Sequence, residues 1–182
     1  AEILTGKLSP SGKLPITWDK NLEASPTYGN YYPNRTKVRS SNTQEAGHVE
    51  YREGIFTGYR GYDKSGNAPR YPFGHGLGYS EFELLNPEVS SSFITDSESG
   101  EEAIAVSVDI KNKGKMRAAE TVQVYVGDPE CSVPRPVKEL KGFEKVTLNP
   151  GQTKQVTIML PKSAFEFYDI DPVSYTHLRA HE

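Results

Sequence analysis

The chain has 182 residues, of which 35% are hydrophobic and 25% are charged, and its formal net charge at pH 7 is −3. This length corresponds to one generous domain or two small ones. The sequence contains no charge block of the kind that binds nucleic acid or an anionic membrane, and no apolar run approaches the ~20 residues that span a bilayer.

Residues 1–78 are rich in turns and loops. The opening AEILTGK predicts the end of a helix at Gly6, and the missing initiator methionine predicts that the chain begins inside a longer protein. SPSGKLPITW then predicts a turn followed by a short strand from Leu14 to Trp18. Residues 20–47 are polar and irregular, and a loop of this length in a compact domain is usually functional or disordered.

Two further blocks close this half of the chain. Residues 51–63, YREGIFTGYRGYD, are rich in aromatic side chains and typical of an ordered segment. Residues 71–79, YPFGHGLGY, place glycines around Phe73 and Leu77, which implies positive φ angles or close backbone contacts.

Apolar and polar residues alternate after residue 79. AIAVSVDIKN, TVQVYV and QVTIML predict strands with these inward side chains: Ile104, Val106, Val108, Ile110, Val122, Val124, Val126, Val156, Ile158 and Leu160. KELKGFEKVTL predicts a strand broken at Gly142, NKGK and LNPGQ predict turns, and AFEFYD begins another strand. Strands joined by turns at roughly 8–12-residue spacing predict an antiparallel β-sandwich.

Four blocks of the sequence carry a family resemblance: PSGKLPITW (10–18), YREGIFTGYRGYD (51–63), YPFGHGLGYSEF (71–82) and RPVKELKGFEKVTLNPG (135–151). In this order they resemble the C-terminal part of a glycoside hydrolase family 3 enzyme of the β-glucosidase type, over residues 1 to about 171. Gly78 departs from the family pattern, which usually has serine there, but it occupies a turn.

The resemblance implies a mainly β fold with two parts. Residues 1–78 would be the loop-rich C-terminal part of an α/β sandwich domain. Residues 79–171 would be an antiparallel fibronectin type III-like β-sandwich, incomplete at its C-terminus. The segment from Tyr51 to Tyr79 would pass the chain from one domain to the other.

The resemblance also implies the chemistry of the parent protein. The family hydrolyses O-glycosidic bonds with retention through two carboxylates, an Asp nucleophile on a barrel domain and a Glu acid/base on the α/β sandwich domain. Both are expected upstream of Ala1, so no catalytic residue is assigned here. The intact enzyme would act on a β-linked glucoside or oligosaccharide. The chain alone, without the barrel domain, is predicted to be an inactive scaffold with no cofactor, metal, nucleic-acid or membrane partner.

Glu53 is the carboxylate that most invites a catalytic interpretation. In a functional role, Glu53 would be an acid/base or a sugar-binding residue. In a structural role, its carboxylate would accept hydrogen bonds from backbone N–H groups in a glycine turn, or pair with Arg52 or Arg60. The resemblance places the catalytic Glu elsewhere, so we predict the structural role. Arg60 and Asp63 are predicted to form a charge-assisted pair.

Other residues of the two blocks are also given structural roles. His75, between two glycines, lacks an adjacent nucleophile or acid partner, so we predict a packing or hydrogen-bonding role. The predicted structural motif comprises Tyr51, Glu53, Gly54, Arg60, Asp63, Phe73, Gly74, His75 and Gly76.

Aromatic side chains in the first half are the candidates for contact with substrate. Trp18, Tyr28, Tyr31 and Tyr32 could stack on a sugar ring, because aromatic faces pack against apolar C–H patches. Anchoring the loop to a neighbouring domain is the alternative that we favour.

Two other features are given no functional role. Asn34-Arg35-Thr36 is a formal N-glycosylation triplet, which is frequent by chance. Cys131 is the only cysteine, which excludes an internal disulfide and a four-cysteine zinc site, and it has no histidine partner. The compartment stays open, with a bacterial periplasmic or extracellular location favoured over a cytoplasmic one.

The last residues, PVSYTHLRAHE (172–182), do not continue the strand pattern of AFEFYD. Read as codons, VSYTHLRAHE can be GTC TCT TAT ACA CAT CTC CGA GCC CAC GAG, which resembles a sequencing-library adapter translated in frame. We therefore predict that residues 172–182 derive from an adapter. In the alternative, a native basic tail, His177 and His181 would share a helix face, but with no third ligand nearby we predict no metal site.

A second hypothesis treats the chain as a non-catalytic module that binds carbohydrate or protein through its β-sandwich. An exposed aromatic strip on one sheet face would support it. Tyr125 is the only aromatic residue at an outward position of TVQVYV, so the sequence gives this hypothesis little support.

Overall fold

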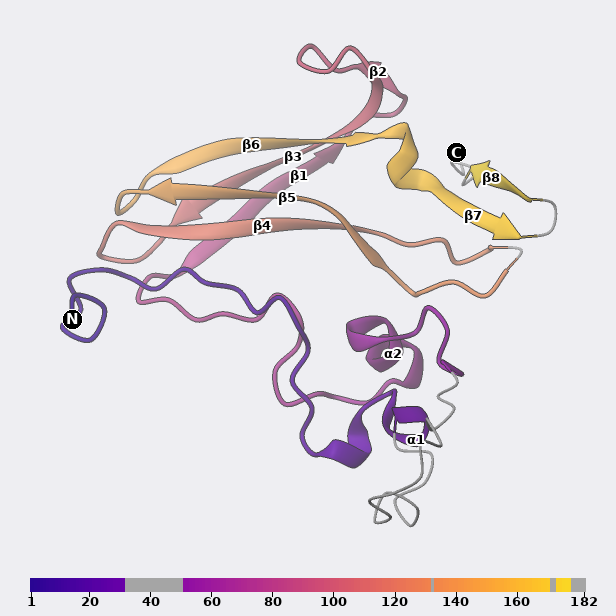
Figure 1. Ribbon diagram of the computed structural model, residues 1–182. Coiled ribbons are helices and arrows are strands. Elements are labelled where there is room, and N and C mark those ends of the chain that lie inside the picture. The colour runs from indigo at the N-terminus through magenta and orange to yellow at the C-terminus, as the bar shows by residue number, and fades with distance from the viewer. Residues whose placement is uncertain (32–50, 132, 171–172, 178–182) are drawn as a thin grey trace. The chain divides into compact units, whose positions relative to one another are not determined.

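The computed structural model describes residues 1–31, 51–131, 133–170 and 173–177 (Figure 1). The chain forms two compact units. The first comprises Ala1–Lys13, Gly76–Ser132 and Lys138–Glu182, and the second comprises Leu14–His75 and Val133–Val137. The predicted domain boundary between residues 78 and 79, and the predicted origin of residues 172–182, stay predictions.

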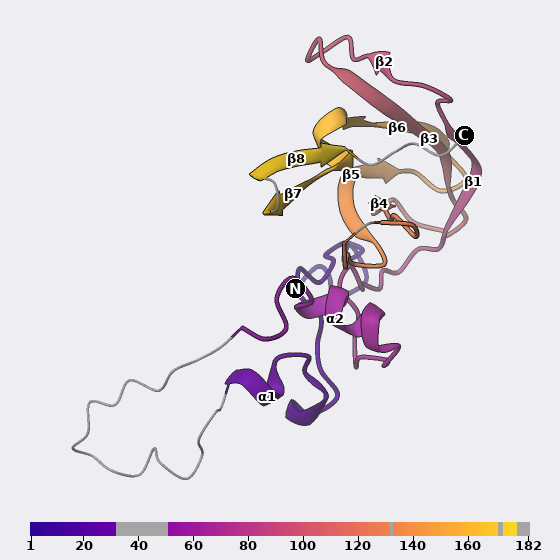
Figure 2. The same cartoon turned by 90° about the vertical axis from the view of Figure 1, so that its right-hand side faces the viewer.

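The first unit contains a β-sandwich, and its fold is mainly β as predicted. Its described strands are β1 (Phe82–Val89), β2 (Ile94–Thr95), β3 (Glu102–Asn112), β4 (Ala118–Val126), β5 (Glu139–Leu148), β6 (Thr153–Pro161), β7 (Glu166–Ile170) and β8 (Val173–His177). Among them, β3 pairs with β1, β2 and β6 in one sheet, β4 pairs with β5 in a second, and β7 pairs with β8. All pairs are antiparallel. The first two sheets face each other (Figures 1 and 2).

The core lies between the two larger sheets. Its buried members are Val108, Ile110, Val122, Val146, Leu148, Val156, Ile158, Leu160 and Ala164. The period-two pattern is therefore confirmed for β3, β4 and β6, because alternate side chains of a strand point to one face. Four of the predicted inward residues, Ile104, Val106, Val124 and Val126, are only partly buried at the margin of this core.

A bulge in β1 changes the face of the strand on which its later side chains lie. The register with β3 shifts between Leu85 and Glu88, and Asn86 there has a φ of +50°. The Asn86 amide donates to the Asp109 carboxylate at 2.9 Å. Because one extra residue reverses the alternation, Val89 returns to the inward face opposite Val106.

The buried side chain of Asn112, at the end of β3, joins several segments of the first unit. Its amide nitrogen donates to the carbonyls of Met116 at 2.9 Å and Leu148 at 3.0 Å. Its amide oxygen accepts from the Ser80 hydroxyl at 2.8 Å and the Gly114 N–H at 2.9 Å. All of its polar atoms are therefore satisfied although the residue is fully buried.

The backbone around Asn112 completes this connection. Its N–H donates to the Gln152 carbonyl at 3.0 Å, and its carbonyl accepts from Gly151 at 2.9 Å. A glycine is required at position 114, because a Cβ there would lie 2.0 Å from the Ser80 hydroxyl oxygen. Four segments therefore meet at one residue: the chain before β1, the β3–β4 turn, the end of β5 and the β5–β6 turn.

The second unit contains little regular secondary structure. Its described helices are η1 (Leu22–Ala24), α1 (Tyr28–Tyr31) and α2 (Gly58–Ser65), and η2 (Lys162–Phe165) belongs to the first unit. Helix α2 ends at Ser65, and Gly66 caps it with a φ of +69° in the left-handed region. A Cβ at Gly61 would lie 2.6 Å from the Pro26 Cβ, so glycine lets the helix approach that proline.

The buried Tyr62 fixes α2 within its unit. Tyr62 is 3% exposed, and its hydroxyl donates to the Asp19 carboxylate at 2.7 Å. Burial, together with the hydrogen bond to Asp19 and the charge of that carboxylate, raises the pKa of Tyr62 to about 12. Neither the helix nor this pair was anticipated from the sequence.

Three segments differ from the sequence-based predictions. Leu14–Trp18 is not a strand, and its one bridge joins Trp18 to Tyr71. AEILTGK forms a turn, with Thr5 N–H donating to the Ala1 carbonyl at 3.0 Å and Gly6 at a φ of +73°, and not the end of a named helix. Residues 173–177 form β8, although no strand was expected there, because Val, Tyr and Thr favour extended backbone beside β7.

The first prediction concerns Asn112. Replacing it with alanine takes the side-chain partner from the Gly114 N–H and the Leu148 carbonyl and leaves the Ser80 hydroxyl and the Met116 carbonyl only their bond to each other. Asn112→Ala should therefore lower the free energy of unfolding by roughly 2 kcal/mol or more. Asn149→Ala, at an exposed turn position, is the matched control and should cost under about 1 kcal/mol. Urea unfolding followed by circular dichroism measures both. Equal losses would contradict the role assigned to Asn112.

The second prediction concerns Tyr62. Its pKa is raised in the folded state, so its stabilising effect is complete below pH 10 and is lost as the pH rises from about 10 to about 12. The wild type should lose on the order of 1–2 kcal/mol more than Tyr62→Phe across this range. Urea unfolding followed by the fluorescence of Trp18, in the same unit, measures it. Lysine side chains titrate equally in the wild type and in Tyr62→Phe. Identical losses of unfolding free energy with pH in the two proteins would therefore refute the prediction.

Candidate functional site

Rings from two distant parts of the sequence stack on one another in the second unit. Trp18 N–H donates to the Tyr71 carbonyl at 2.8 Å. The rings of Trp18 and Tyr71 meet edge to face at 6.3 Å, and those of Tyr71 and His75 stack at 5.2 Å. Trp18 is 51% exposed, so about half of its surface stays open to solvent.

His75 takes part in backbone contacts as well as in this stack. Its N–H donates to the Pro72 carbonyl at 3.1 Å, and its carbonyl accepts from Leu14 at 2.8 Å. Gly74, with a φ of +78°, donates its N–H to the Leu14 carbonyl at 2.8 Å. His75 therefore joins the stack and two backbone segments, and its predicted packing role stays a prediction.

Glu53 lies in a turn whose geometry depends on glycine. Gly54 has a φ of +55°, and its N–H donates to the Tyr51 carbonyl at 3.0 Å. The Glu53 carboxylate accepts a hydrogen bond from the Asn30 amide, a partner that the sequence did not suggest. The Glu53 carbonyl accepts from Phe56 N–H at 3.0 Å. The carboxylate therefore links two segments of its unit, while the Tyr51 ring is 80% exposed.

The remaining motif residues lie on or near α2. The rings of Tyr59 and Phe73 stack at 4.9 Å, and the Arg60 guanidinium lies 5.9 Å from the centre of the Tyr59 ring. Arg60 and Asp63 are three residues apart on α2, a spacing at which side chains meet on a helix surface. Their predicted charge-assisted pair stays a prediction.

The predicted aromatic cluster of the loop is described only in part. Tyr28 is half-buried at the start of α1, and its N–H donates to the Ser25 carbonyl at 3.0 Å. Tyr32 and the triplet at residues 34–36 lie outside the described residues, as does the side chain of Tyr31. A sugar-stacking role for Trp18, Tyr28, Tyr31 and Tyr32 stays a prediction.

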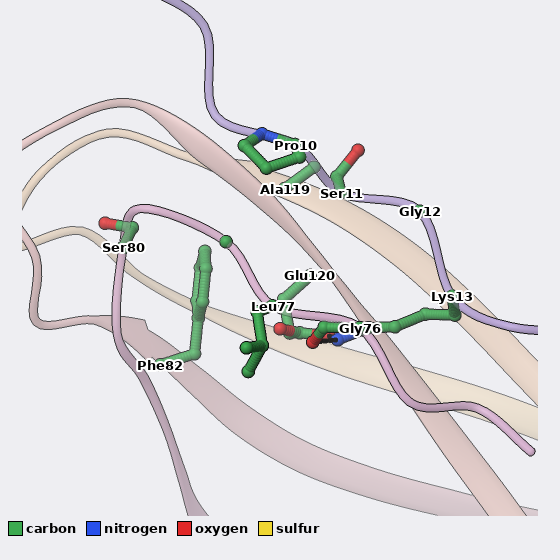
Figure 3. A pocket seen from close by; sticks show the side chains of 11 residues that line it. Pro10, Ser11, Gly12, Lys13, Gly76, Leu77, Ser80, Phe82, Ala119 and Glu120 are labelled. Atoms are coloured by element: carbon green, nitrogen blue, oxygen red, sulfur yellow. Dashed lines mark hydrogen bonds and ion pairs between the residues drawn. The ribbon is translucent and has the colours of Figure 1, made fainter. Parts of the chain in front are cut away.

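The first unit contains a small hollow beside the start of β4 (Figure 3). The Lys13 ammonium lies 2.6 Å from the Glu120 carboxylate and donates to the Gly76 carbonyl at 3.1 Å. Gly76 cannot carry a side chain, since a Cβ would lie 2.1 Å from the Gly12 carbonyl oxygen. The hollow measures about 10 Å³, room for about one water molecule and too small for a sugar ring.

This ion pair was missed by the sequence analysis. Lys13 lies in PSGKLPITW, for which the sequence predicted only a turn and a short strand. No local pattern links position 13 to position 120, so only the folded chain could bring them together. The pair holds the segment that ends at Lys13 against β4.

Other kinds of site find no support in the part of the chain that the structure describes. There, no group of three or more His, Cys, Asp or Glu side chains could hold a metal ion. Across the same residues, no helix is long and apolar enough to cross a membrane. Cys131 is half-buried as a free thiol.

Family models match both halves of the chain. Residues 1–59 match the glycosyl hydrolase family 3 C-terminal domain, and residues 120–176 match the fibronectin type III-like domain. The second match ends at residue 176, within β8, and therefore extends past residue 171.

Curated relatives match almost the whole chain. It is 46% identical over 169 residues to thermostable beta-glucosidase B of Acetivibrio thermocellus. The aligned region covers 93% of this chain and 20% of that protein. It is 40% identical to beta-glucosidase BoGH3A of Bacteroides ovatus, over 93% of this chain and 21% of that protein. The chain thus spans about a fifth of the length of these relatives.

Solved structures agree with these matches. The β-glucosidase DesR of Streptomyces venezuelae, in complex with D-glucose, has a TM-score of 0.79 and 32% identity over 97% of this chain and 21% of its own. The Bifidobacterium adolescentis GH3 β-glucosidase has a TM-score of 0.77 and 37% identity over 93% of this chain and 22% of its own. With both domain models in the predicted order and these relatives across the chain, the protein belongs to glycoside hydrolase family 3.

Proposed function

We propose that this chain is the C-terminal part of a retaining β-glycosidase of the β-glucosidase type, which hydrolyses O-glycosidic bonds of β-linked glucosides or oligosaccharides. The 46% identity to a β-glucosidase over 93% of the chain is the observation that carries the proposal. The parent reaction is a double displacement through a glycosyl-enzyme intermediate.

Within this reaction the chain serves as a scaffold. A retaining site needs two carboxyl groups about 5–5.5 Å apart, one ionised and one with a raised pKa. The carboxylates of Asp19, Glu53 and Glu120 instead bind Tyr62, Asn30 and Lys13. We expect the Asp nucleophile and the Glu acid/base in residues of the parent that precede Ala1.

The hydrogen bonds of Asp96 also disfavour a role as general acid for that residue. The Glu98 N–H and the Ser99 hydroxyl donate to its carboxylate, at 3.1 and 2.8 Å, and hold the pKa of Asp96 below its usual value. A general acid in a glycosidase needs the opposite shift, because it must carry its proton near neutral pH.

A second candidate function, carbohydrate binding by the β-sandwich, rests on a different observation. Phe143 on β5 is 65% exposed and lies directly across from Gln123 on β4. The Tyr125 hydroxyl donates to the Gln123 side chain at 2.7 Å, so Tyr125 shares this outer face. Two aromatic rings beside an amide form the kind of surface that packs on a sugar ring and binds its hydroxyls.

The third prediction tests the scaffold role. The purified 182-residue chain should give no turnover of p-nitrophenyl β-D-glucoside above a mock purification, because it lacks both carboxylates, whereas the parent protein should hydrolyse this substrate. Release of nitrophenol is followed by absorbance. Turnover that survives the mock control would overturn the assignment of catalysis to other parts of the parent.

The fourth prediction separates the two candidate functions. If the outer face of β4 and β5 binds sugar, soluble β-glucan in a native gel should retard the chain, and Phe143→Ala should remove the retardation. Leu4→Ala, at a position 90% exposed, is the control and should leave it unchanged. Equal mobility of all three proteins with and without β-glucan would exclude the binding function.

A further inference from the structure

The turn between β3 and β4, at one end of the sandwich (Figure 1), carries cationic side chains at alternate positions. They are Lys111, Lys113, Lys115 and Arg117, and residues 111–117 include no acidic residue. Lys113, Lys115 and Arg117 are exposed, and Lys111 is half-buried. These four residues form a basic ridge on a chain whose formal net charge is −3.

The residues between the cations face the interior of the first unit. Asn112 is fully buried, and Ala118 is 5% exposed. A Cβ at Gly114 would lie 2.0 Å from the Ser80 hydroxyl oxygen. Because alternate residues of a strand point to opposite faces, Lys111 is directed away from the core. The inward residues therefore fix which side of the turn is presented to solvent.

The backbone of the ridge is held in place by buried hydrogen bonds. The Asn112 amide nitrogen donates to the Met116 carbonyl at 2.9 Å, and its amide oxygen accepts from the Gly114 N–H at 2.9 Å. The Ser80 hydroxyl also lies 3.2 Å from the Met116 carbonyl oxygen, to which it donates. A ligand would therefore have to order only side chains, which lowers the entropic cost of binding.

Nearby carboxylates neutralise only part of the charge of the ridge. The Lys113 ammonium lies 3.8 Å from the Glu83 carboxylate, and the two side chains are 45% and 42% exposed, so the pair is weak. Glu81 contacts Lys113 through its carbonyl, which accepts from the Lys113 N–H at 2.8 Å. The Asp109 carboxylate accepts from the Asn86 amide at 2.9 Å. Even with Glu81 and Glu83 counted against it, the ridge keeps an excess of positive charge.

We propose that the basic ridge binds an acidic polysaccharide, a polymer of uronic acid residues, through the carboxylates of the polymer. Ammonium and guanidinium groups form charge-assisted hydrogen bonds with carboxylates. The charge of the ridge by itself selects a polyanion. The choice of a sugar polymer rests on the proposed function, in which the parent protein acts on carbohydrate.

The charge of the whole chain disfavours nucleic acid as the polyanion. Duplex DNA carries one negative charge per about 1.7 Å of its axis, so a chain of net negative charge repels it strongly outside the ridge. A uronic acid polymer carries one carboxylate per sugar and is repelled less. Three of the four cations are lysines, which act as point charges and do not favour the planar readout of bases that arginine provides.

The test titrates the 182-residue chain with an oligogalacturonate of about ten sugars by isothermal titration calorimetry. Binding should be saturable and should weaken roughly fivefold or more between about 50 and about 200 mM salt. The same oligosaccharide with its carboxyl groups methyl-esterified is the matched ligand and should not bind. Absence of binding of the free acid up to millimolar concentration, or equal binding of the ester, would overturn the proposal.

Matched variants locate the site. Lys113→Gln, Lys115→Gln and Arg117→Gln combined should weaken binding by roughly tenfold or more. The control removes the same charge from exposed positions elsewhere, with Lys7→Gln, Lys20→Gln and Lys145→Gln combined, and should change binding less than about threefold. Circular dichroism checks the fold of both. Equal losses in the two triple variants would assign the binding to net charge and overturn the site.

One variant should act in the opposite direction. Glu83→Gln frees Lys113 from its carboxylate partner and should tighten binding about twofold. Weaker binding by this variant would contradict the role given to Lys113.

A second ligand separates the classes of polyanion. A single-stranded oligonucleotide with the same number of charges should bind more weakly than the oligogalacturonate. Tighter binding of the oligonucleotide would make nucleic acid the partner and overturn the choice of a polysaccharide. The titration measures binding only, whereas turnover of p-nitrophenyl β-D-glucoside by the parent protein tests the proposed function, so the failure of one is distinguishable from the failure of the other.

Discussion

One buried asparagine holds the closed end of the β-sandwich together. The Asn112 side chain hydrogen-bonds a hydroxyl, an N–H and two carbonyls from separate segments of the first unit. Ser80 enters this network from the segment before β1, and Leu148 enters it from the end of β5. The same side chain therefore contacts the segment that enters the sandwich, the β3–β4 turn and the end of β5.

This arrangement suits a supporting part of a larger enzyme. The charged groups with described partners join segments within their own unit: Lys13 with Glu120, Tyr62 with Asp19, and Asn30 with Glu53. Each contact limits the movement of a loop, and none brings two carboxylates to a sugar-sized cavity. In the parent enzyme proposed above, the catalytic groups need rigid positioning, and these contacts within the chain are of a kind that supplies it.

The sequence predicted the sandwich well because alternation is a local property. The inward residues of β3, β4 and β6 follow from a period of two, and the four blocks predicted the family that the domain models match. The Asn112 network, the Lys13–Glu120 pair and the Tyr62–Asp19 bond were not predictable, since each joins positions distant in sequence. The bulge at Asn86 was also missed, and α2 escaped prediction because glycines obscure its helical pattern.

The central claim is that this chain belongs to a longer retaining β-glycosidase and supports a catalytic site built by other residues. Sequencing the source gene with long reads through both ends of this region tests it most directly. The account predicts upstream codons for a barrel with an Asp nucleophile and for the Glu acid/base, and codons for further strands after residue 171 in place of VSYTHLRAHE. A gene that starts near Ala1 and ends with RAHE would contradict it.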